Sequence, residues 1–439
     1  MTSGTTEPRD VTPGLGEACE ALSEARERTN KLIEPLSTDQ LQTVHSPLMS
    51  PLVWDLGHIA AFEDLWVSRT FERSMVRPEL MAVYDADETP RANRGSLPML
   101  DLDGALAYQE AVRAQTLELL DSVWETPERR PAALTSDRLE LIVRHEHQHN
   151  ETMLQTAQLA HLPGPFRPTP ANTAANNAVT GLDLIDIPGG TARIGAPEGR
   201  FAYDNERGRH EVELRPFQIG RSPVTNGDWQ DFIATGGYRN NELWSEAGWA
   251  WRREEDVQRP LHWSDDHHHW VLDRLEPIDR DAPVVHVSFF EAEAFAKFHQ
   301  KRLPSEQEWE WAATCDPAGR QRSNPWGAEP VSADLANVDQ AAGRPLPAGS
   351  YPNGVSASGL NALIGDVWEW TASEFRGYPG FKPFPYREYS EQFFGPNYRV
   401  LRGGSWAARA RTVNTTFRNW DLPQRRQIFS GLRLAADAK

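Results

Sequence analysis

Three histidines lie close together in the stretch VRHEHQHNETM, residues 143–153. Each residue of an α-helix advances by about 100°, so His145 and His149 project from one face while His147 points almost opposite. Apolar residues, among them Ile142, continue that face in both directions, which directs the two histidines into a protein core. Buried imidazoles need partners, because an unsatisfied polar group in a core costs about 1–3 kcal/mol. Either a metal ion or a hydrogen-bond network would meet this need.

A third histidine that faces the same core would favour the metal. His58 meets this condition, because Trp54 and Phe62 flank it at helical spacing in another stretch. Two ligands from one helix and one from a second helix are a common arrangement in helix bundles. Neutral imidazoles suit zinc, iron, copper and nickel, so the ligand type leaves the metal open. Three protein ligands leave coordination positions for substrates, which is typical of catalytic sites.

Other histidines are weaker candidates for a metal site. His45 falls in an expected loop, TVHSPLMS, and the triplet His267–His269 lies in the polar stretch DDHHHW, which we interpret as a solvated loop. We therefore place the candidate metal centre at His58, His145 and His149.

Helices must position these histidines. Leucine and alanine recur at helical spacing from Leu15 to Leu36, and a second helix is expected in SPLVWDLGHIAAFEDLW, with Ser50 as N-cap and Pro51 at the first helical position. A third helix is expected from about Asp101 to Trp124, and a fourth from about Ser136 to Leu162. Helices with irregular connections of this kind predict a four-helix bundle.

The second half of the chain has a different character. Short β-prone pieces such as LDLIDIP and HEVELRPFQIG alternate with turns and long irregular stretches. Thirteen of the sixteen tryptophans follow residue 200, so indole rings should fill much of this core. The expected fold is α+β in two domains: a disordered N-terminus over 1–14, a helix bundle over 15–162, a linker over 163–181 and a loop-rich mixed domain over 182–437.

Composition excludes several classes of protein. Hydrophobic residues make up 39% and charged residues 25%, which is typical of a soluble globular protein. A net charge of −18 and a pI near 5.2 argue against nucleic acid or an anionic membrane as a partner. We find neither an apolar run long enough for a bilayer nor a secretory signal. The chain has only two cysteines, Cys19 and Cys315, which indicates a reducing cytoplasm.

Several motifs together resemble two known domain families. HEHQHNE, from His145 to Glu151, with His58 upstream, resembles the metal motif of DinB-like bundles. PVTNGDW, RLPSEQEWEWAA, GDVWEWT, RVLRGGSW and GLRL resemble the formylglycine-generating-enzyme (sulfatase-modifying factor) domain, a variant of the C-type lectin fold. A DinB-like bundle followed by this domain is the architecture of the ergothioneine-biosynthesis sulfoxide synthases. These are non-haem iron(II) oxygenases that join hercynine to a thiol with O2.

This resemblance extends from about residue 15 to residue 437. SPLVWDLGHI, YDADETPRANR and FRNWDLPQRRQIFSGLRL look especially similar to the actinobacterial branch, which uses γ-glutamylcysteine. The resemblance implies Fe(II) on the three histidines and a γ-glutamyl-hercynylcysteine S-oxide product. In one respect the chain departs from the formylglycine-generating enzymes, which work through a pair of C-terminal cysteines. No cysteine follows Cys315 here, so cysteine-based oxidation is not expected in this domain.

The resemblance also implies how the thiol substrate is held. Arg91 and Arg425 resemble the family's carboxylate clamps, because a guanidinium binds a carboxylate through two parallel hydrogen bonds. Asp421 resembles the residue that meets the substrate ammonium group. Arg94 and Arg426 lie close enough in sequence to compete for the two clamp assignments.

Hercynine carries a quaternary ammonium group and a carboxylate. A quaternary ammonium favours an aromatic face, and Trp420 in RNWD is the candidate. Asn419 and Gln148 resemble polar contacts to the imidazole or the carboxylate of hercynine.

Sulfoxidation with C–S bond formation needs a proton donor, and a tyrosine hydroxyl can serve. The stretch PGFKPFPYREYS offers Tyr386 and Tyr389, and Tyr378 lies just upstream. Alignment on YREYS gives Tyr386 the family's catalytic position, with Tyr389 as a supporting candidate.

Several alternatives stay open. A sister enzyme would use cysteine as the thiol, with hercynine or histidine as acceptor, the latter leading towards ovothiol. Paired Arg91 and Arg425 favour the longer thiol with two carboxylates. A different class is a non-catalytic, lectin-like binding module on a metal-stabilised bundle, and another is a DinB-like thiol transferase that uses zinc. Uptake of O2 separates both from an oxygenase.

Overall fold

The computed structural model describes residues 15–126, 131–167, 180–384 and 386–438. The chain divides into two compact units. The first comprises Met1–Pro165 with Pro197–Ala202, and the second comprises Phe166–Ala196 with Tyr203–Lys439. The N-terminus that we expected to be disordered, and most of the expected linker, lie outside the described residues.

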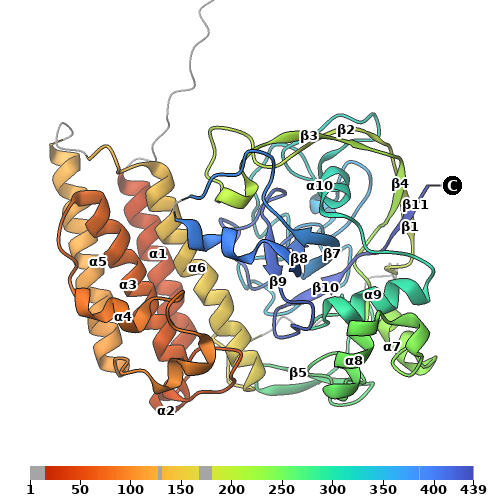
Figure 1. The fold of residues 1–439 in the computed structure, drawn as a ribbon, viewed down its shortest axis with the longest axis horizontal. Coiled ribbons are helices and arrows are strands. Elements are labelled where there is room, and N and C mark those ends of the chain that lie inside the picture. The colour runs from red at the N-terminus through yellow and green to blue at the C-terminus, as the bar shows by residue number, and fades with distance from the viewer. Residues whose placement is uncertain (1–14, 127–130, 168–179, 385, 439) are drawn as a thin grey trace, which may run out of the picture. The chain divides into compact units, whose positions relative to one another are not determined.

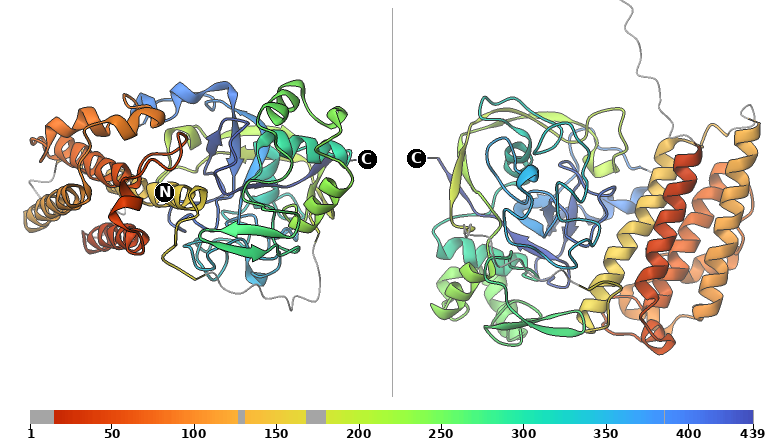
Figure 2. Two further views of the ribbon diagram at one scale, coloured as in Figure 1. Left: turned by 90° about the horizontal axis from the view of Figure 1, so that it is seen from below. Right: turned by 180° about the vertical axis from the view of Figure 1, so that it is seen from behind.

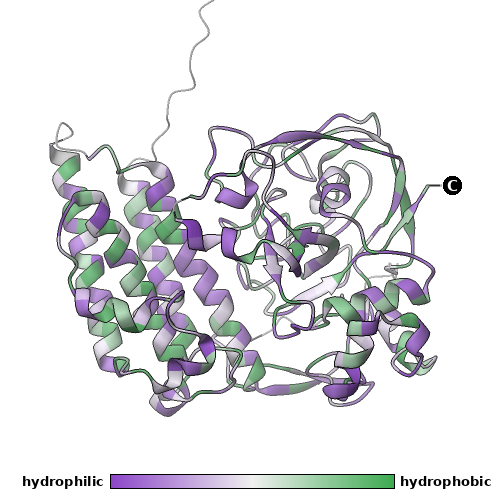
Figure 3. Ribbon diagram, in the orientation of Figure 1, coloured by the Kyte–Doolittle hydropathy of each residue, from purple (hydrophilic) through white to green (hydrophobic). Residues whose placement is uncertain are grey.

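The first unit is a bundle whose long helices lie side by side (Figures 1 and 2). Helix α1 packs on α6, and α3 packs on both α5 and α6. Hydrophobic and hydrophilic residues alternate along these helices (Figure 3), as expected of amphipathic faces. Among the described residues, no helix has the length and apolar character needed to cross a bilayer. The helices of this unit are α1 (Leu15–Ile33), α2 (Thr38–Gln42), α3 (Leu52–Phe71), η1 (Pro78–Leu80), α4 (Met81–Tyr84), η2 (Arg91–Ser96), α5 (Leu102–Glu125) and α6 (Ser136–Leu159).

Helix α3 is buried on all sides, and its polar residues make the bundle interior partly polar. Of its 20 residues, 17 are buried, and these include Asp55, His58 and Glu63. Each buried polar side chain needs a partner inside the protein. Glu63 pairs with the guanidinium of Arg113 at 2.8 Å, and the partners of Asp55 and His58 lie at the candidate metal centre.

The start of α3 differs from the prediction. Pro51 is the N-cap and Leu52 the first helical residue, so Ser50 as N-cap was wrong. The Ser50 hydroxyl instead accepts a hydrogen bond from Nη1 of Arg94 at 2.7 Å, a tertiary contact that replaces the local cap. The start of α5 agrees with the sequence, because Asp101 is its N-cap and the Asp101 side chain accepts a backbone hydrogen bond.

The second unit combines small sheets with short helices, and the predicted α+β class is confirmed. A four-stranded sheet has the order β10–β7–β8–β9, in which β10 and β7 are parallel and the other pairs antiparallel. An antiparallel sheet has the order β1–β4–β11, and two ribbons pair β2 with β3 and β5 with β6. The strands are β1 (Leu184–Ile187), β2 (Gly190–Ile194), β3 (His210–Leu214), β4 (Phe217–Gly220), β5 (His268–Val271), β6 (Arg274–Pro277), β7 (Trp368–Phe375), β8 (Gly395–Arg402), β9 (Asn419–Asp421), β10 (Ser430–Leu432) and β11 (Ala435–Asp437). The helices are η4 (Asp204–Glu206), α7 (Asn226–Ala234), η5 (Asn241–Leu243), α8 (Glu246–Glu254), α9 (Phe289–Phe298), α10 (Glu306–Thr314), η6 (Pro352–Gly354), η7 (Arg387–Tyr389) and η8 (Glu391–Phe393).

Tryptophans fill the core of the second unit, as predicted. Trp229, Trp309, Trp311 and Trp370 are fully buried, and the indole N–H of Trp309 donates to Glu369 at 2.8 Å. The same core holds buried ion pairs that the sequence pattern did not indicate. These pairs are Arg402–Glu310, Arg418–Glu306 and Arg433–Glu369.

The histidine triplet is not a loop throughout, so that interpretation was partly wrong. His268 and His269 begin β5, which pairs with β6 through Val271 and Arg274. Leu272 has a φ of 53° in the tight turn between the strands, as hairpin geometry requires. His267 and His268 are exposed, but His269 is half-buried.

Candidate metal centre

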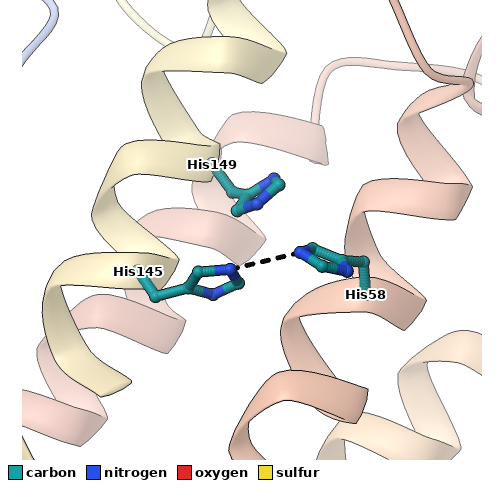
Figure 4. A group of neighbouring side chains, drawn as sticks. All are labelled: His58, His145 and His149. Carbon is teal, nitrogen blue, oxygen red and sulfur yellow. Dashed lines mark hydrogen bonds between the residues drawn. The ribbon is translucent and has the colours of Figure 1, made fainter. Parts of the chain in front are cut away.

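His58, His145 and His149 point toward one another in the bundle interior (Figure 4). One ring nitrogen of each lies within 4.8 Å of the other two. Nε2 of His58 and Nε2 of His145 are 3.1 Å apart. His58 comes from α3, and the other two lie one turn apart on α6. The four-residue spacing therefore places two histidines on one helix face, opposite the third.

His58 is held by its neighbours in a fixed orientation. Its Nδ1 lies 2.6 Å from the carbonyl oxygen of Tyr84, and because a carbonyl only accepts, Nδ1 donates and Nε2 keeps its lone pair for the cluster. The indole of Trp54 stacks on the ring at 4.8 Å and 11°, and the Arg94 guanidinium lies 3.7 Å from that indole. A Cβ at Gly57 would lie 2.2 Å from the Tyr84 ring, so glycine permits this approach.

His149 is oriented by a carboxylate. Its Nδ1 lies 3.0 Å from Oδ1 of Asp55, which is buried on α3. A carboxylate that accepts from Nδ1 leaves Nε2 available to a metal. Among the described residues, Oδ2 of Asp55 has no hydrogen-bond partner. Burial lowers the pKa of Arg94 to about 10, and the Asp55 carboxylate opposes this shift, so the two charges stabilise each other.

Burial favours the neutral form, which a metal requires, in His58 and His145. Burial lowers the pKa of His58 and of His145 well below the usual range, and the imidazole of His149 lowers both further. The ring of Phe62 stacks on His145 with centroids 3.5 Å apart, which shields it from water. Neutral imidazoles are the metal-binding form. Three convergent imidazoles, two of which are oriented by a hydrogen bond at Nδ1, fit a transition metal.

Neighbouring residues on α6 face other directions. His147 is buried against α1, where its Nε2 lies 3.3 Å from the Glu24 carboxylate without hydrogen-bond geometry. Gln148 is half-buried and, one residue before His149, is rotated by about 100° from it.

A buried ion-pair network fixes α6 beside the histidines. Glu146 contacts Arg26 at 2.8 Å and Arg113 at 3.0 Å. Glu63 of α3 shares Arg113, and the hydroxyl of Thr29 donates to Glu146 at 2.8 Å. The network links α1, α3, α5 and α6, and therefore sets the rotation at which α6 presents its ligands.

The two arginines of η2 have different surroundings. Arg91 is exposed, and its Nη1 makes a 3.3 Å hydrogen bond to the Leu48 carbonyl. Arg94 is buried and donates to Ser50 at 2.7 Å and to the Thr89 carbonyl at 2.9 Å. Protein acceptors thus occupy Arg94, while Arg91 is accessible to a ligand.

Asn419, Trp420 and Asp421 form the edge strand β9 of the second unit. One face of Trp420 is covered, because Phe375 stacks on it at 4.2 Å and 8°. The backbone N–H of Trp420 donates to Oδ1 of Asn419 at 2.9 Å. Phe393 also meets the indole, with centroids 5.6 Å apart.

Arg425 has a donor that none of the described residues satisfies. Its Nε lies 3.8 Å from Oδ1 of Asp421, and its buried Nη1 has no hydrogen-bond partner among the described residues. A ligand carboxylate would satisfy this nitrogen. Arg426, by contrast, donates to the Arg259 carbonyl at 3.1 Å and lies 3.7 Å from Glu291.

The three candidate tyrosines differ in their surroundings. Tyr378 is buried, its hydroxyl donates to Glu306 at 3.2 Å, and burial raises its pKa far above the usual range. Tyr386 and Tyr389 are half-buried, with rings in edge contact at 6.1 Å. Tyr389 also meets the ring of Trp420 at 5.9 Å. Tyr378 is therefore committed to the core, whereas the other two belong to the aromatic group around Trp420.

The candidate residues thus form one group in each unit. The histidines converge in the first unit, where Arg91 is exposed and Gln148 half-buried. In the second unit, Tyr386, Tyr389 and Trp420 are in ring contact, and Asp421 pairs with Arg425. Sequence reasoning missed Asp55, although its position three residues before His58 places it on the same helix face. It also missed Phe375, for which the sequence offered no signal.

Known proteins match the chain in the same two parts. Residues 170–438 match the family described as sulfatase-modifying factor enzyme 1-like domain, and residues 21–153 match the DinB superfamily. A hercynine oxygenase of Mycolicibacterium smegmatis is 45% identical over 426 residues, which cover 95% of this chain and 97% of the relative. A hercynine oxygenase of Mycobacterium tuberculosis is 43% identical over 438 residues, with coverage of 95% and 97%. A formylglycine-generating enzyme of Streptomyces coelicolor is 30% identical over 305 residues, covering 58% of this chain and 89% of that enzyme.

Proposed function

This chain belongs to the hercynine oxygenase family, and from that premise we propose that it joins hercynine to γ-glutamylcysteine with O2. The thiol loses its hydrogen, and the imidazole carbon between the two nitrogens loses another. One oxygen atom goes to sulfur and the second leaves as water, so the product is γ-glutamyl-hercynylcysteine S-oxide. The observation that carries the proposal is the cluster of three convergent histidines in a chain of this family.

As a member of an oxygenase family, the chain is an enzyme. This sets aside the non-catalytic binding module and the zinc-dependent transferase. We propose iron as the metal, held by His58, His145 and His149. Fe(II), when bound, supplies the redox chemistry that activates O2. In this proposal, Tyr84 and Asp55 bind Nδ1 of His58 and of His149, so that Nε2 of each ring is directed at the metal.

The thiol substrate matches the charges of three residues. γ-Glutamylcysteine carries two carboxylates and one ammonium group. In the proposal, Arg425 binds one carboxylate through its unsatisfied Nη1, Asp421 binds the ammonium, and the exposed Arg91 binds the second carboxylate. Cysteine has only one carboxylate and would leave one arginine without a partner.

Hercynine requires an aromatic face and polar contacts. Trp420 would attract the quaternary ammonium through its indole ring. Asn419 and Gln148 would contact its carboxylate or imidazole.

Tyr386 would supply the proton. In this role its Oη donates a proton to the oxygen atom that leaves as water. Tyr389, in ring contact with both Tyr386 and Trp420, would support its position. Without the proton, the thiol would take up both atoms of O2 and end as a sulfinate. Replacing Tyr386 with Phe should therefore favour sulfinate over the coupled product.

A competition between thiols tests the substrate assignment. The holoenzyme would receive hercynine and O2 with equal concentrations of γ-glutamylcysteine and cysteine, and mass spectrometry would quantify the products. The proposal expects mainly a product with one oxygen more and two hydrogens fewer than hercynine plus γ-glutamylcysteine. Mainly cysteine conjugate would assign the chain to the sister enzymes, and a parallel reaction with histidine in place of hercynine tests the acceptor.

The proposal includes a cytoplasmic location. Cys19 and Cys315 are both free thiols. Free thiols are typical of proteins in a reducing compartment, which supports this location.

A further inference from the structure

A short segment of the second unit contacts the chain on both sides of Tyr386, at Phe384 and at Ser390. We call residues 384–390 the tyrosine stretch. Asp204, in η4, is fully buried. Its Oδ1 accepts a hydrogen bond from the Ser390 hydroxyl at 2.5 Å, and its Oδ2 accepts from the backbone N–H of Phe384 at 3.4 Å. Phe384 lies two residues before Tyr386, and Ser390 lies four residues after it. One carboxylate therefore binds a residue on each side of the tyrosine in the sequence.

The neighbours of Asp204 add three contacts to the same stretch. Nδ2 of Asn205 donates to the Ser390 hydroxyl at 3.0 Å. The ring of Tyr203 stacks on that of Tyr389 at 4.7 Å and 12°. The guanidinium of Arg207 lies 3.8 Å from the centre of the Phe384 ring. We call residues 203–207 the clamp segment.

The clamp segment is itself fixed to the core. The carbonyl of Asn205 accepts from Nη1 of Arg418 at 2.7 Å, and this fully buried guanidinium also binds Glu306 through two further donors. Oε2 of Glu206 accepts from the hydroxyl of Thr416 at 2.7 Å. The contacts run from the buried ion pairs of the core, through the clamp segment, to the tyrosine stretch.

We propose that Asp204 is a positioning residue for Tyr386, because its carboxylate fixes the backbone on both sides of that tyrosine and hence the direction of the phenol. The inference rests on the proposed role of Tyr386 as proton donor. Asp204 does not touch substrate. When it is lost, Tyr386 spends less time in the donating position, and a larger share of the thiol ends as sulfinate, which takes both oxygen atoms of O2 and leaves hercynine unchanged.

Two variants of the full-length holoenzyme test this role. Asp204→Asn keeps the size of the side chain but presents an amide donor in place of one carboxylate oxygen. Ser390→Ala is the milder change, because it removes only the hydroxyl. The ratio of coupled product to sulfinate should fall about five- to tenfold in Asp204→Asn, the change that one buried hydrogen bond of ordinary strength corresponds to. It should fall less in Ser390→Ala, and KM for hercynine should stay constant in both variants.

Asp366 provides a matched control. It is a buried carboxylate of the same unit that accepts from Nδ2 of Asn337 at 2.7 Å and from the backbone N–H of Leu346 at 2.9 Å. Like Asp204, it accepts from one side chain and one backbone N–H, but these partners lie outside the stretch that carries Tyr386. Asp366→Asn should lower the melting temperature without changing the product ratio.

A double variant separates this inference from the proposed function. If Asp204 acts through Tyr386, then Asp204→Asn should not change the product ratio further in a Tyr386→Phe background. The inference alone is overturned if Tyr386→Phe shifts the ratio while folded Asp204→Asn and Ser390→Ala keep the wild-type ratio. If Tyr386→Phe leaves the ratio unchanged, the proton-donor role fails and the inference falls with it.

Discussion

The two groups of candidate site residues lie on different kinds of backbone: long helices in the bundle and an irregular connection in the second unit. In the bundle, the ligands project from the long helices α3 and α6, and Asp55 of α3 contacts His149 of α6 across the helix interface. In the second unit, Tyr386 lies on the connection between β7 and β8. Its flanking residues bind Asp204, which is 180 and 186 positions away from them.

This difference separates what each region can tolerate. A helix keeps its backbone when one side chain is lost, so damage to the histidine cluster should stay local and appear as weaker metal binding. A connection held by distant side chains loses its backbone conformation when one contact is removed. Damage to the tyrosine stretch should appear as a changed product ratio with metal still bound. The predictions below test this division in order of expected effect.

The largest effect is expected from removal of a histidine of the cluster. His145→Ala should abolish coupled product and weaken Fe(II) binding more than 100-fold. Loss of a residue that only hydrogen-bonds a metal ligand typically weakens metal binding roughly 10- to 100-fold, and loss of the ligand itself should cost more. Equilibrium dialysis with metal analysis measures the binding. His147→Gln on the same helix is the control and should keep the metal. Unchanged metal content in His145→Ala would remove that residue from the site.

A large but different effect is expected in the second unit. Arg425→Ala should raise KM for the thiol about 30- to 100-fold, because a bidentate guanidinium–carboxylate pair is among the stronger hydrogen-bonded contacts. Metal affinity should not change. Arg425→Lys keeps the charge but not the planar, two-pronged guanidinium geometry. Its KM for the thiol should lie between those of the wild type and of Arg425→Ala. A rise in KM for hercynine alone would contradict the assignment of Arg425 to the thiol.

An intermediate effect is expected from the orienting carboxylate. Asp55→Ala should weaken metal binding about 10- to 100-fold, and Asp55→Asn less, because its amide oxygen still accepts from Nδ1 of His149. Asp64→Asn is the matched control: Asp64 is a buried carboxylate of the same helix whose partners, Tyr108 and the Val76 N–H, lie outside the cluster. Equal metal affinity in Asp55→Ala and the wild type would show that His149 needs no orienting partner.

The smallest effect concerns the pH dependence of stability in the metal-free protein. Folding lowers the pKa of His58 and His145 through burial, so below pH about 6.5 the unfolded chain binds protons that the folded chain does not. Their contribution is fully present above that pH. It should fall by about 1.4 kcal/mol per pH unit for each histidine as the pH decreases. Denaturant unfolding between pH 5 and 8 measures how the free energy of unfolding changes with pH. His145→Gln should reduce this slope by about 1.4 kcal/mol per pH unit, the contribution of one proton. A slope that His145→Gln leaves unchanged would contradict the burial of that imidazole.

Much of the architecture could be predicted from the sequence. The α+β class and the membership in an oxygenase family are confirmed by the matched families and by relatives that are 43–45% identical over nearly the full chain. Helical periodicity placed His145 and His149 on one face, since it depends only on local geometry. Spacing alone could not choose the metal.

Contacts between distant residues could not be predicted. Ser50 has the composition of an N-cap, yet Arg94 takes its hydroxyl. The ion pairs of Glu146 with Arg26 and Arg113 join residues 120 and 33 positions apart, and a single sequence carries no signal for such pairing. The clamp segment belongs to the same class, because the Asp204–Ser390 hydrogen bond exists only once the second unit has folded.

The most direct measurement of the central claim is oxygen uptake by protein loaded with one equivalent of Fe(II) under anaerobic conditions. Hercynine and γ-glutamylcysteine are added, O2 is admitted, and O2 consumption and product mass are recorded together. The account predicts one O2 consumed for each coupled sulfoxide formed, no coupled product when iron or either substrate is omitted, and none from His145→Ala. Coupled product from metal-free protein, or from His145→Ala at the wild-type rate, would contradict it.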